Sequence, residues 1–237
     1  ILAGGLGTRL RAAVPSLPKV IAPVAGRPFA AWLLAHLGRQ GLQRAVLCTG
    51  YLADLVEAAL GDQQSGIQLA YARETKPLGT GGALRAALVY THSDPVLVVN
   101  GDSLLAAPLA PLLARHNSSG AETTLALAEL ADTSASGHVE LDVRGRVRRF
   151  AEKRSTGPGL VNAGVYVISR ARLQAIPEHN EISLEHTLIP AWLADGIWAW
   201  PSGAPLLDIG TESSYANAAG FLRAAGLIAD EAKRGRR

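Results

Sequence analysis

The 237-residue chain contains no methionine, a single cysteine and few aromatic side chains. One cysteine, Cys48, excludes an intramolecular disulfide, and its apolar neighbours predict that it is a small core residue. No apolar run approaches the roughly 18–20 residues needed to cross a bilayer, and no signal-peptide pattern is present. We therefore expect a cytoplasmic protein without a membrane partner. Because Ile1 stands inside a strand-like run, we also expect a few native residues before it.

The chain also lacks a large excess of positive or negative charge. Lys and Arg total 23 against 20 Asp and Glu, and a formal net charge of +3 does not favour a nucleic-acid partner. Basic residues concentrate at 144–149 and in a C-terminal tail, 226–237, for which a solvated terminus is the simplest interpretation. The length fits one large α/β domain with a sizeable core.

Short apolar runs alternate with amphipathic segments up to about residue 117, which predicts βαβ units and a mostly parallel sheet. In this part we expect strands at 44–49, 67–72 and 96–100, and helices at 28–37, 52–60 and 79–90. Further along we expect strands at 123–130, 161–169 and 197–200, a hairpin over 138–152, and helices over 183–192 and 211–225.

The N-terminal run Leu2-Ala3-Gly4-Gly5-Leu6-Gly7-Thr8-Arg9-Leu10 predicts a phosphate-binding loop. Glycines let backbone N–H groups approach an anion, and Arg9 and Lys19 add charged donors. A dinucleotide fingerprint would need a third glycine where Leu10 stands, and the chain has no Gly-Lys-Ser/Thr. A plain strand-to-helix turn would explain the glycines but not the basic residues beside them.

Two aspartates follow apolar runs and are candidates for binding a metal ion. Asp102 follows Pro95-Val96-Leu97-Val98-Val99-Asn100, at the expected carboxyl end of a parallel sheet, where open α/β folds bind ligands. Asp208 follows Pro205-Leu206-Leu207. Mg²⁺ takes one or two carboxylates together with phosphate oxygens and water. For each aspartate, a turn or helix N-cap is the alternative interpretation.

The motifs of this chain resemble, in their order, those of the sugar-1-phosphate nucleotidyltransferases. The similarity runs from residue 1 to about residue 220 and rests on the opening motif with Pro18-Lys19, Leu78-Gly79-Thr80-Gly81-Gly82-Ala83, Asn100-Gly101-Asp102, Glu152-Lys153, Asn162-Ala163-Gly164 and Asp208-Ile209-Gly210-Thr211.

This resemblance implies a Rossmann-like, three-layer α/β/α fold with a mostly parallel central sheet and a small antiparallel sugar-binding subregion. A single domain would span 1–225, with 1–117 mainly nucleotide-binding and 118–225 mainly sugar-phosphate-binding. The implied reaction is attack of a sugar phosphate oxygen on the α-phosphorus of a nucleoside triphosphate. A phosphomonoester is mostly dianionic near neutral pH, so positioning and positive charge suffice without a general base.

By resemblance, Arg9 holds the β- and γ-phosphates, Lys19 stabilises the α-phosphate, and Asp102 and Asp208 hold Mg²⁺. Arg9, Lys19 and Asp102 are thus the expected catalytic residues. The residues expected around the sugar phosphate are Gly101, Glu152, Lys153, Asn162 and Gly164. For Glu152 and Lys153 a hairpin-edge ion pair is the alternative.

The nucleotide is expected to contact Leu2, Ala3, Gly4, Gly5, Gly7, Thr8, Gly79 and Thr80. Glu74 is a candidate acceptor for the adjacent N–H groups of guanine, and equally a solvated loop residue.

Within the family the chain is similar to short guanylyltransferases acting on D-glycero-α-D-manno-heptose 1-phosphate, which favours GTP and a product for surface polysaccharide. Mannose-1-phosphate guanylyltransferase and N-acetylmuramate-1-phosphate uridylyltransferase remain open, as does a non-catalytic nucleotide-sensing homologue. A dehydrogenase is disfavoured by the missing third glycine. A homodimer is compatible with the sequence.

Overall fold

A computed structural model describes residues 1–5, 7, 10, 14–133, 138–150 and 157–228. Its strands are β1 (Pro23–Val24), β2 (Arg27–Pro28), β3 (Arg44–Thr49), β4 (Gln63–Gln64), β5 (Ile67–Arg73), β6 (Val96–Val99), β7 (Ser103–Leu105), β8 (Thr123–Leu130), β9 (Val139–Leu141), β10 (Val147–Phe150), β11 (Gly159–Ile168), β12 (Trp198–Pro201) and β13 (Leu206–Asp208). Its helices are α1 (Phe29–Gly38), α2 (Ala53–Leu60), α3 (Gly79–Ala87), α4 (Ala110–Ser119), α5 (Arg170–Gln174), α6 (Ile189–Trp192) and α7 (Glu212–Ala224).

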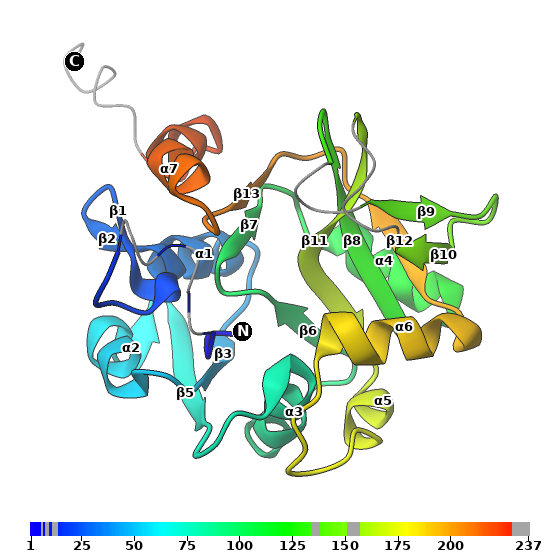
Figure 1. Ribbon diagram of the computed structural model, residues 1–237, viewed down its shortest axis with the longest axis horizontal. Helices are drawn as coiled ribbons and strands as arrows, with labels where there is room; N and C mark the ends of the chain where they lie inside the picture. The colour runs from blue at the N-terminus through cyan, green and yellow to red at the C-terminus, as the bar shows by residue number, and fades with distance from the viewer. Residues whose placement is uncertain (6, 8–9, 11–13, 134–137, 151–156, 229–237) are drawn as a thin grey trace.

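The central sheet is formed by two groups of strands that the N-terminal segment joins (Figure 1). One group is β4-β5-β3 and the other is β6-β11-β8-β12. Leu2 forms parallel bridges to both Cys48 of β3 and Asn100 after β6. The opening motif therefore starts from the middle of the sheet, as the apolar residues before it predict.

Both groups of strands are mixed, and in the first group only the short β4 is antiparallel to its neighbour β5. β3 and β5 are parallel, whereas β11 runs antiparallel to both β6 and β8. β12 returns parallel to β8. The α/β fold class is confirmed. The antiparallel β11 departs from a mostly parallel sheet, because it follows the β9–β10 hairpin and not a helical crossover.

Helices cover both faces of the sheet, which gives three layers. In β11, Val165 and Val167 pack into the cluster that contains α1 and α7 side chains. Tyr166 and Ile168 pack into the cluster formed with α3 and α5. Successive strand residues point to opposite faces, so one strand contributes to both cores.

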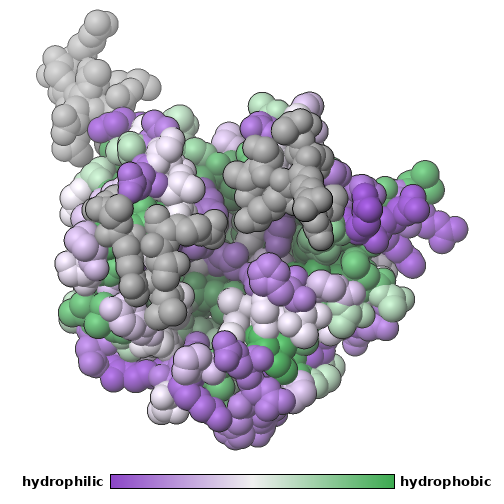
Figure 2. Space-filling view, viewed as in Figure 1, coloured by the Kyte–Doolittle hydropathy of each residue, from purple (hydrophilic) through white to green (hydrophobic). Residues whose placement is uncertain are grey.

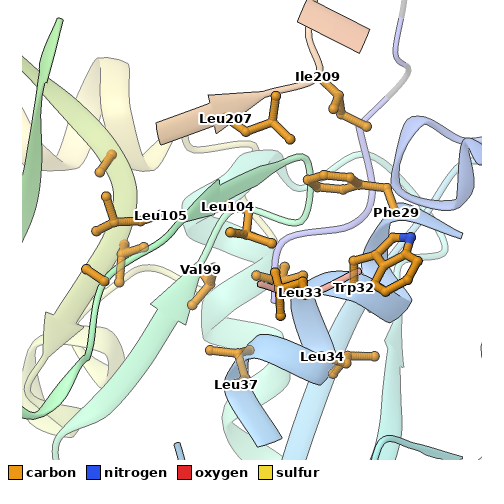
Figure 3. Close-up of a cluster of buried hydrophobic side chains, with 14 of the residues drawn as sticks. Phe29, Trp32, Leu33, Leu34, Leu37, Val99, Leu104, Leu105, Leu207 and Ile209 are labelled. Carbon is orange, nitrogen blue, oxygen red and sulfur yellow. The ribbon is translucent and has the colours of Figure 1, made fainter. Parts of the chain in front are cut away.

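The core on the α1 side is drawn in Figure 3, where Phe29, Leu33 and Leu37 of α1 lie against the sheet. Figure 3 also shows Leu104 and Leu207 there, from the antiparallel pair β7 and β13. Sequence patterns had not predicted this pair. It matters for the site because its register sets Asp208 opposite Ser103, the residue after Asp102.

Most other expected elements agree with the structure. Ser183 accepts a hydrogen bond from the His186 amide and begins a helical turn, and Thr211 forms a capping box at the start of α7. The predicted hairpin is β9 and β10. Cys48 is buried, as predicted. No helix among the described residues combines the length and apolar character that a membrane crossing requires.

Candidate active site

A cavity of about 720 Å³ lies at the ends of the central strands. Figure 2 shows this face of the molecule hollowed between its N-terminal and C-terminal halves. The predicted residues that line the cavity are Leu2, Gly4, Gly5, Gly7, Lys19, Glu74, Gly79, Thr80 and Asp102. Thr8, Arg9, Glu152 and Lys153 lie outside the described residues, so their predicted roles stay predictions.

Lys19 comes from a short helical turn, Lys19–Ile21, and reaches the predicted metal ligands. Its Nζ atom donates to Asp102 Oδ2 at 2.7 Å and to Asp208 Oδ1 at 3.4 Å. The Lys19 side chain is only 11% exposed, so this cation is stabilised by the two carboxylates rather than by bulk water.

The two aspartates are positioned by backbone contacts between separate segments. The Ile209 amide donates to the Asp102 carbonyl at 3.0 Å. The Gly210 amide donates to Asp208 Oδ1 at 2.6 Å, and a Cβ at Gly210 would lie 3.1 Å from Lys19 Nζ. Glycine at this position therefore leaves room for the lysine and the carboxylate. The structure thus brings together two carboxylates that lie 106 positions apart in the sequence.

Both carboxylates contact the Lys19 ammonium. The same pair of carboxylates fits a divalent ion that takes its remaining ligands from phosphate oxygens and water. Within the described ranges, no group of three or more His, Cys, Asp or Glu side chains is arranged to hold a metal ion.

Glu74 lies at another part of the same cavity, after β5. Its Oε2 atom accepts the Leu78 amide at 2.9 Å, and a Cβ at Gly4 would lie 3.1 Å from its Oε1 atom. Burial raises the pKa of Glu74 above its ordinary value, and the Leu78 amide partly offsets this effect. Glu74 is therefore a partly buried carboxylate beside the glycine loop rather than a fully solvated one.

The glycines of the Leu78–Gly82 motif allow it to pack closely against another segment of backbone. Cβ atoms at Gly79 and Gly82 would lie 2.6 Å from the Ile182 carbonyl and 2.5 Å from the Asn180 carbonyl. Gly79 also has a φ of +68°, which favours glycine. The motif thus receives the backbone of residues 180–182 in close contact.

The hydroxyl of Thr80 is engaged by protein groups. It accepts the Leu184 amide at 2.7 Å and donates to Glu185 Oε2 at 2.9 Å. Its single proton is therefore used, so the hydroxyl could only accept a hydrogen bond from a nucleotide.

Several predicted residues lie beside the cavity without lining it. Ala3 is buried in the sheet, and its amide donates to the Cys48 carbonyl. A Cβ at Gly101 would lie 2.7 Å from the Leu2 carbonyl, so this glycine permits close strand packing. Asn162 accepts the Gly164 amide at 3.0 Å and donates to the Tyr166 hydroxyl at 2.8 Å. Gly164 has a φ of +69° and contacts Asn100.

The cavity also contains residues that sequence reasoning missed, notably Tyr51, Lys76, Asn100, Glu181 and Glu185. Glu181 and Glu185 follow no strand and belong to no motif that had been singled out. The expected helix over 183–192 covers Glu185, but nothing in the local pattern directs either side chain to the cavity.

The fold and this cavity define a nucleotide-binding transferase. A family model described as nucleotidyl transferase matches residues 1–224, and the chain belongs to this family. It is a nucleotidyltransferase, and its resemblance to the sugar-1-phosphate nucleotidyltransferases is confirmed.

Two curated relatives illustrate the range of sugars. A mannose-1-phosphate guanylyltransferase of Mycobacterium tuberculosis is 38% identical, over 100% of this chain and 67% of that protein. A D-glycero-α-D-manno-heptose 1-phosphate guanylyltransferase of Aneurinibacillus thermoaerophilus is 35% identical, over 92% and 95%. The solved structure of HddC from Yersinia pseudotuberculosis matches with a TM-score of 0.82 and 30% identity, over 93% of this chain and 97% of that chain. HddC has also been solved complexed with GMP-PN.

Proposed function

We propose that this chain transfers a guanylyl group from GTP to a sugar 1-phosphate, forming a GDP-sugar and releasing pyrophosphate. A phosphate oxygen of the sugar phosphate attacks the α-phosphorus of GTP, and the bond from that phosphorus to the bridging oxygen of pyrophosphate breaks. No protein nucleophile is needed, because the attacking phosphate is already anionic. The protein supplies orientation and positive charge.

The observation that carries this proposal is the convergence of Lys19, Asp102 and Asp208 beside the glycine loop. Lys19 would stabilise the charge that develops as pyrophosphate leaves, and Arg9 would hold the β- and γ-phosphates. Asp102 and Asp208 would hold Mg²⁺, since their oxygens already share one cation at 2.7 and 3.4 Å. When bound, Mg²⁺ supplies Lewis-acid charge at the phosphates.

Glu74 supports guanine as the base. A carboxylate can accept two adjacent N–H groups of guanine, and Glu74 sits at the cavity wall next to Gly4. The curated relatives named above are both guanylyltransferases, which supports the same choice. GTP and sugar phosphates as substrates also support a cytoplasmic location.

For the sugar, we propose D-glycero-α-D-manno-heptose 1-phosphate, with a product that serves surface polysaccharide. Lys153 would receive the sugar phosphate, while Glu152, Asn162, Gly101 and Gly164 would surround the sugar. Mannose 1-phosphate is the second candidate, because the 38% identical relative carries that name.

A substrate grid tests the proposal. Pyrophosphate release is measured with GTP, UTP, CTP, ATP and dTTP against heptose, mannose, glucose and N-acetylmuramate 1-phosphates in the presence of Mg²⁺. The expected result is the highest kcat/KM for GTP with heptose 1-phosphate. Preference for UTP with N-acetylmuramate 1-phosphate would refute the guanylyl assignment. Nucleotide binding without turnover of any pair would favour a non-catalytic homologue instead.

A further inference from the structure

One chain of hydrogen bonds links the nucleotide side of the cavity to its sugar side, and Glu185 is at its centre. Glu185 follows the capping residue Ser183, in the helical turn Leu184–Leu188. Its Oε2 atom accepts the Thr80 hydroxyl at 2.9 Å, and its Oε1 atom accepts the Tyr166 hydroxyl at 3.4 Å. Glu185 also lines the cavity. Its carboxylate therefore accepts hydrogen bonds from side chains of both α3 and β11.

The Tyr166 hydroxyl continues the chain toward the sugar side. It accepts from Asn162 Nδ2 at 2.8 Å, and Asn162 Oδ1 accepts the Gly164 amide at 3.0 Å. The Asn162–Tyr166 hydrogen bond lies where the pairing register of β11 with β8 shifts, between these two residues. The irregular backbone there is consistent with a strand shaped for a ligand rather than for pairing alone.

Because Tyr166 is buried, bulk water cannot replace the hydrogen bonds of its hydroxyl. The Tyr166 side chain is fully buried, so its hydroxyl relies on protein partners. Burial and the nearby Glu185 carboxylate raise the pKa of Tyr166 well above its ordinary value. The phenol therefore stays protonated and can donate to Glu185 at any pH of interest.

The glycine motif fixes Glu185 in this position. The Gly81 amide donates to the Ile182 carbonyl at 2.8 Å, and the Ile182 amide donates to the Leu78 carbonyl at 2.8 Å. These two backbone hydrogen bonds attach residues 180–185 to the start of α3. The Leu184 amide adds a third contact, to the Thr80 hydroxyl.

We propose that Glu185 is a positioning residue for nucleotidyl transfer, which couples Thr80 on the nucleotide side to Asn162 on the sugar side through Tyr166. The role rests on the proposed function, because Asn162 is assigned there to the sugar. Glu185 would hold the Asn162 amide in the orientation that meets the sugar hydroxyls once the nucleotide is bound. Loss of its charge would affect sugar phosphate more than GTP.

A double-mutant cycle tests this role. Glu185→Gln keeps the shape of the side chain, and Tyr166→Phe removes only the hydroxyl. Each is expected to raise KM for the sugar phosphate by about tenfold, the size of one hydrogen bond to a charged group, and to leave the Kd of GTP within about twofold. Because both variants interrupt one chain, the double variant should be little worse than either single variant.

Glu181→Gln is the matched control, since Glu181 lines the same cavity but forms no hydrogen bond with Thr80 or Tyr166 in the described structure. Its effect should add to that of Tyr166→Phe. Glu185→Asp, which restores the charge, should recover part of the loss.

The possible failures are distinct. An active wild type in which Glu185→Gln and Tyr166→Phe have additive effects would overturn the role of Glu185 and leave the proposed function standing. If Glu185→Gln weakens the binding of GTP and of sugar phosphate equally and lowers the melting temperature, Glu185 has only a structural role. A wild type inactive with every substrate pair would overturn both proposals.

Discussion

Lys19 Nζ lies between two carboxylates, and its shorter contact, 2.7 Å, is to Asp102 Oδ2. The two strands that fix this arrangement, β7 and β13, are an antiparallel pair in which Asp208 is opposite Ser103. A divalent ion held by the same carboxylates would compete with the ammonium for their oxygens. Lys19 would then be released to contact phosphate.

Asp102→Asn removes the charge at nearly constant shape. We expect kcat to fall by at least about 100-fold, because stabilisation of the charge on the transferring phosphate is lost. Steady-state kinetics over a series of Mg²⁺ concentrations measures this effect, and thermal unfolding checks that the fold is intact. Near wild-type kcat with an unchanged Mg²⁺ dependence would remove Asp102 from the metal site.

Lys19→Met is expected to have opposite effects on turnover and on metal binding. Turnover should fall by about 100-fold or more. The affinity for Mn²⁺ in the absence of nucleotide should rise, since the competing cation is gone, and calorimetry or Mn²⁺ electron paramagnetic resonance measures it. Lys76→Met is the control, because Lys76 lines the cavity but forms no ion pair with either carboxylate in the described structure. Equal or weaker Mn²⁺ binding in Lys19→Met would contradict competition.

Glu74 predicts a pH dependence of GTP binding. Burial raises the pKa of Glu74 above 4.5, so the carboxylate takes up a proton at a higher pH than an exposed glutamate does. If the ionised form accepts the guanine N–H groups, the affinity for GTP falls as the pH is lowered through this raised pKa. The same shift opposes folding when Glu74 is ionised, so its unfavourable effect on stability grows as the pH rises from the unfolded-state pKa and is complete above the folded-state pKa.

Titration of GTP into the wild type and Glu74→Gln between pH 4.5 and 8 measures the expected loss. The variant should bind GTP more weakly and lose this part of the pH dependence. An identical pH profile in both proteins would show that Glu74 does not contact the base.

Gly79→Ala should destabilise the fold for two reasons. The residue has a φ of +68°, and its Cβ would lie 2.6 Å from the Ile182 carbonyl oxygen. Gly41→Ala is a matched control, because Gly41 has a φ of +88° but no atom within 4 Å of the added Cβ. We expect a loss of about 1 kcal/mol for Gly41→Ala and at least about 2 kcal/mol for Gly79→Ala, from urea unfolding. Equal losses would show that contact with Ile182 contributes nothing.

Helices and strands that depend on local sequence patterns were predicted well. Short, largely apolar runs identified β3 and β8 at their observed bounds, and Thr211 marked the start of α7. The lysine and the two aspartates of the site were identified by motif. Their meeting at 2.7 and 3.4 Å depends on strand pairing that motif spacing does not encode.

Long-range contacts explain what sequence reasoning missed. Gly79 was expected to contact the nucleotide and does line the cavity, but its second task, shared with Gly82, is to admit the backbone of residues 180–182. Nothing near Gly79 indicates a partner about a hundred positions away. Glu185 was missed for the same reason, because its role depends on Thr80 and Tyr166 and not on its neighbours.

The attachment of residues 180–182 to the glycine motif has a consequence for how specificity can change. The Leu78–Ile182 and Gly81–Ile182 hydrogen bonds involve backbone atoms on both partners. Side chains along this segment can therefore be exchanged while the attachment persists. Substitutions in this segment can thus change the part of the cavity wall that Glu181 forms, while the glycine loop and the two aspartates keep their positions.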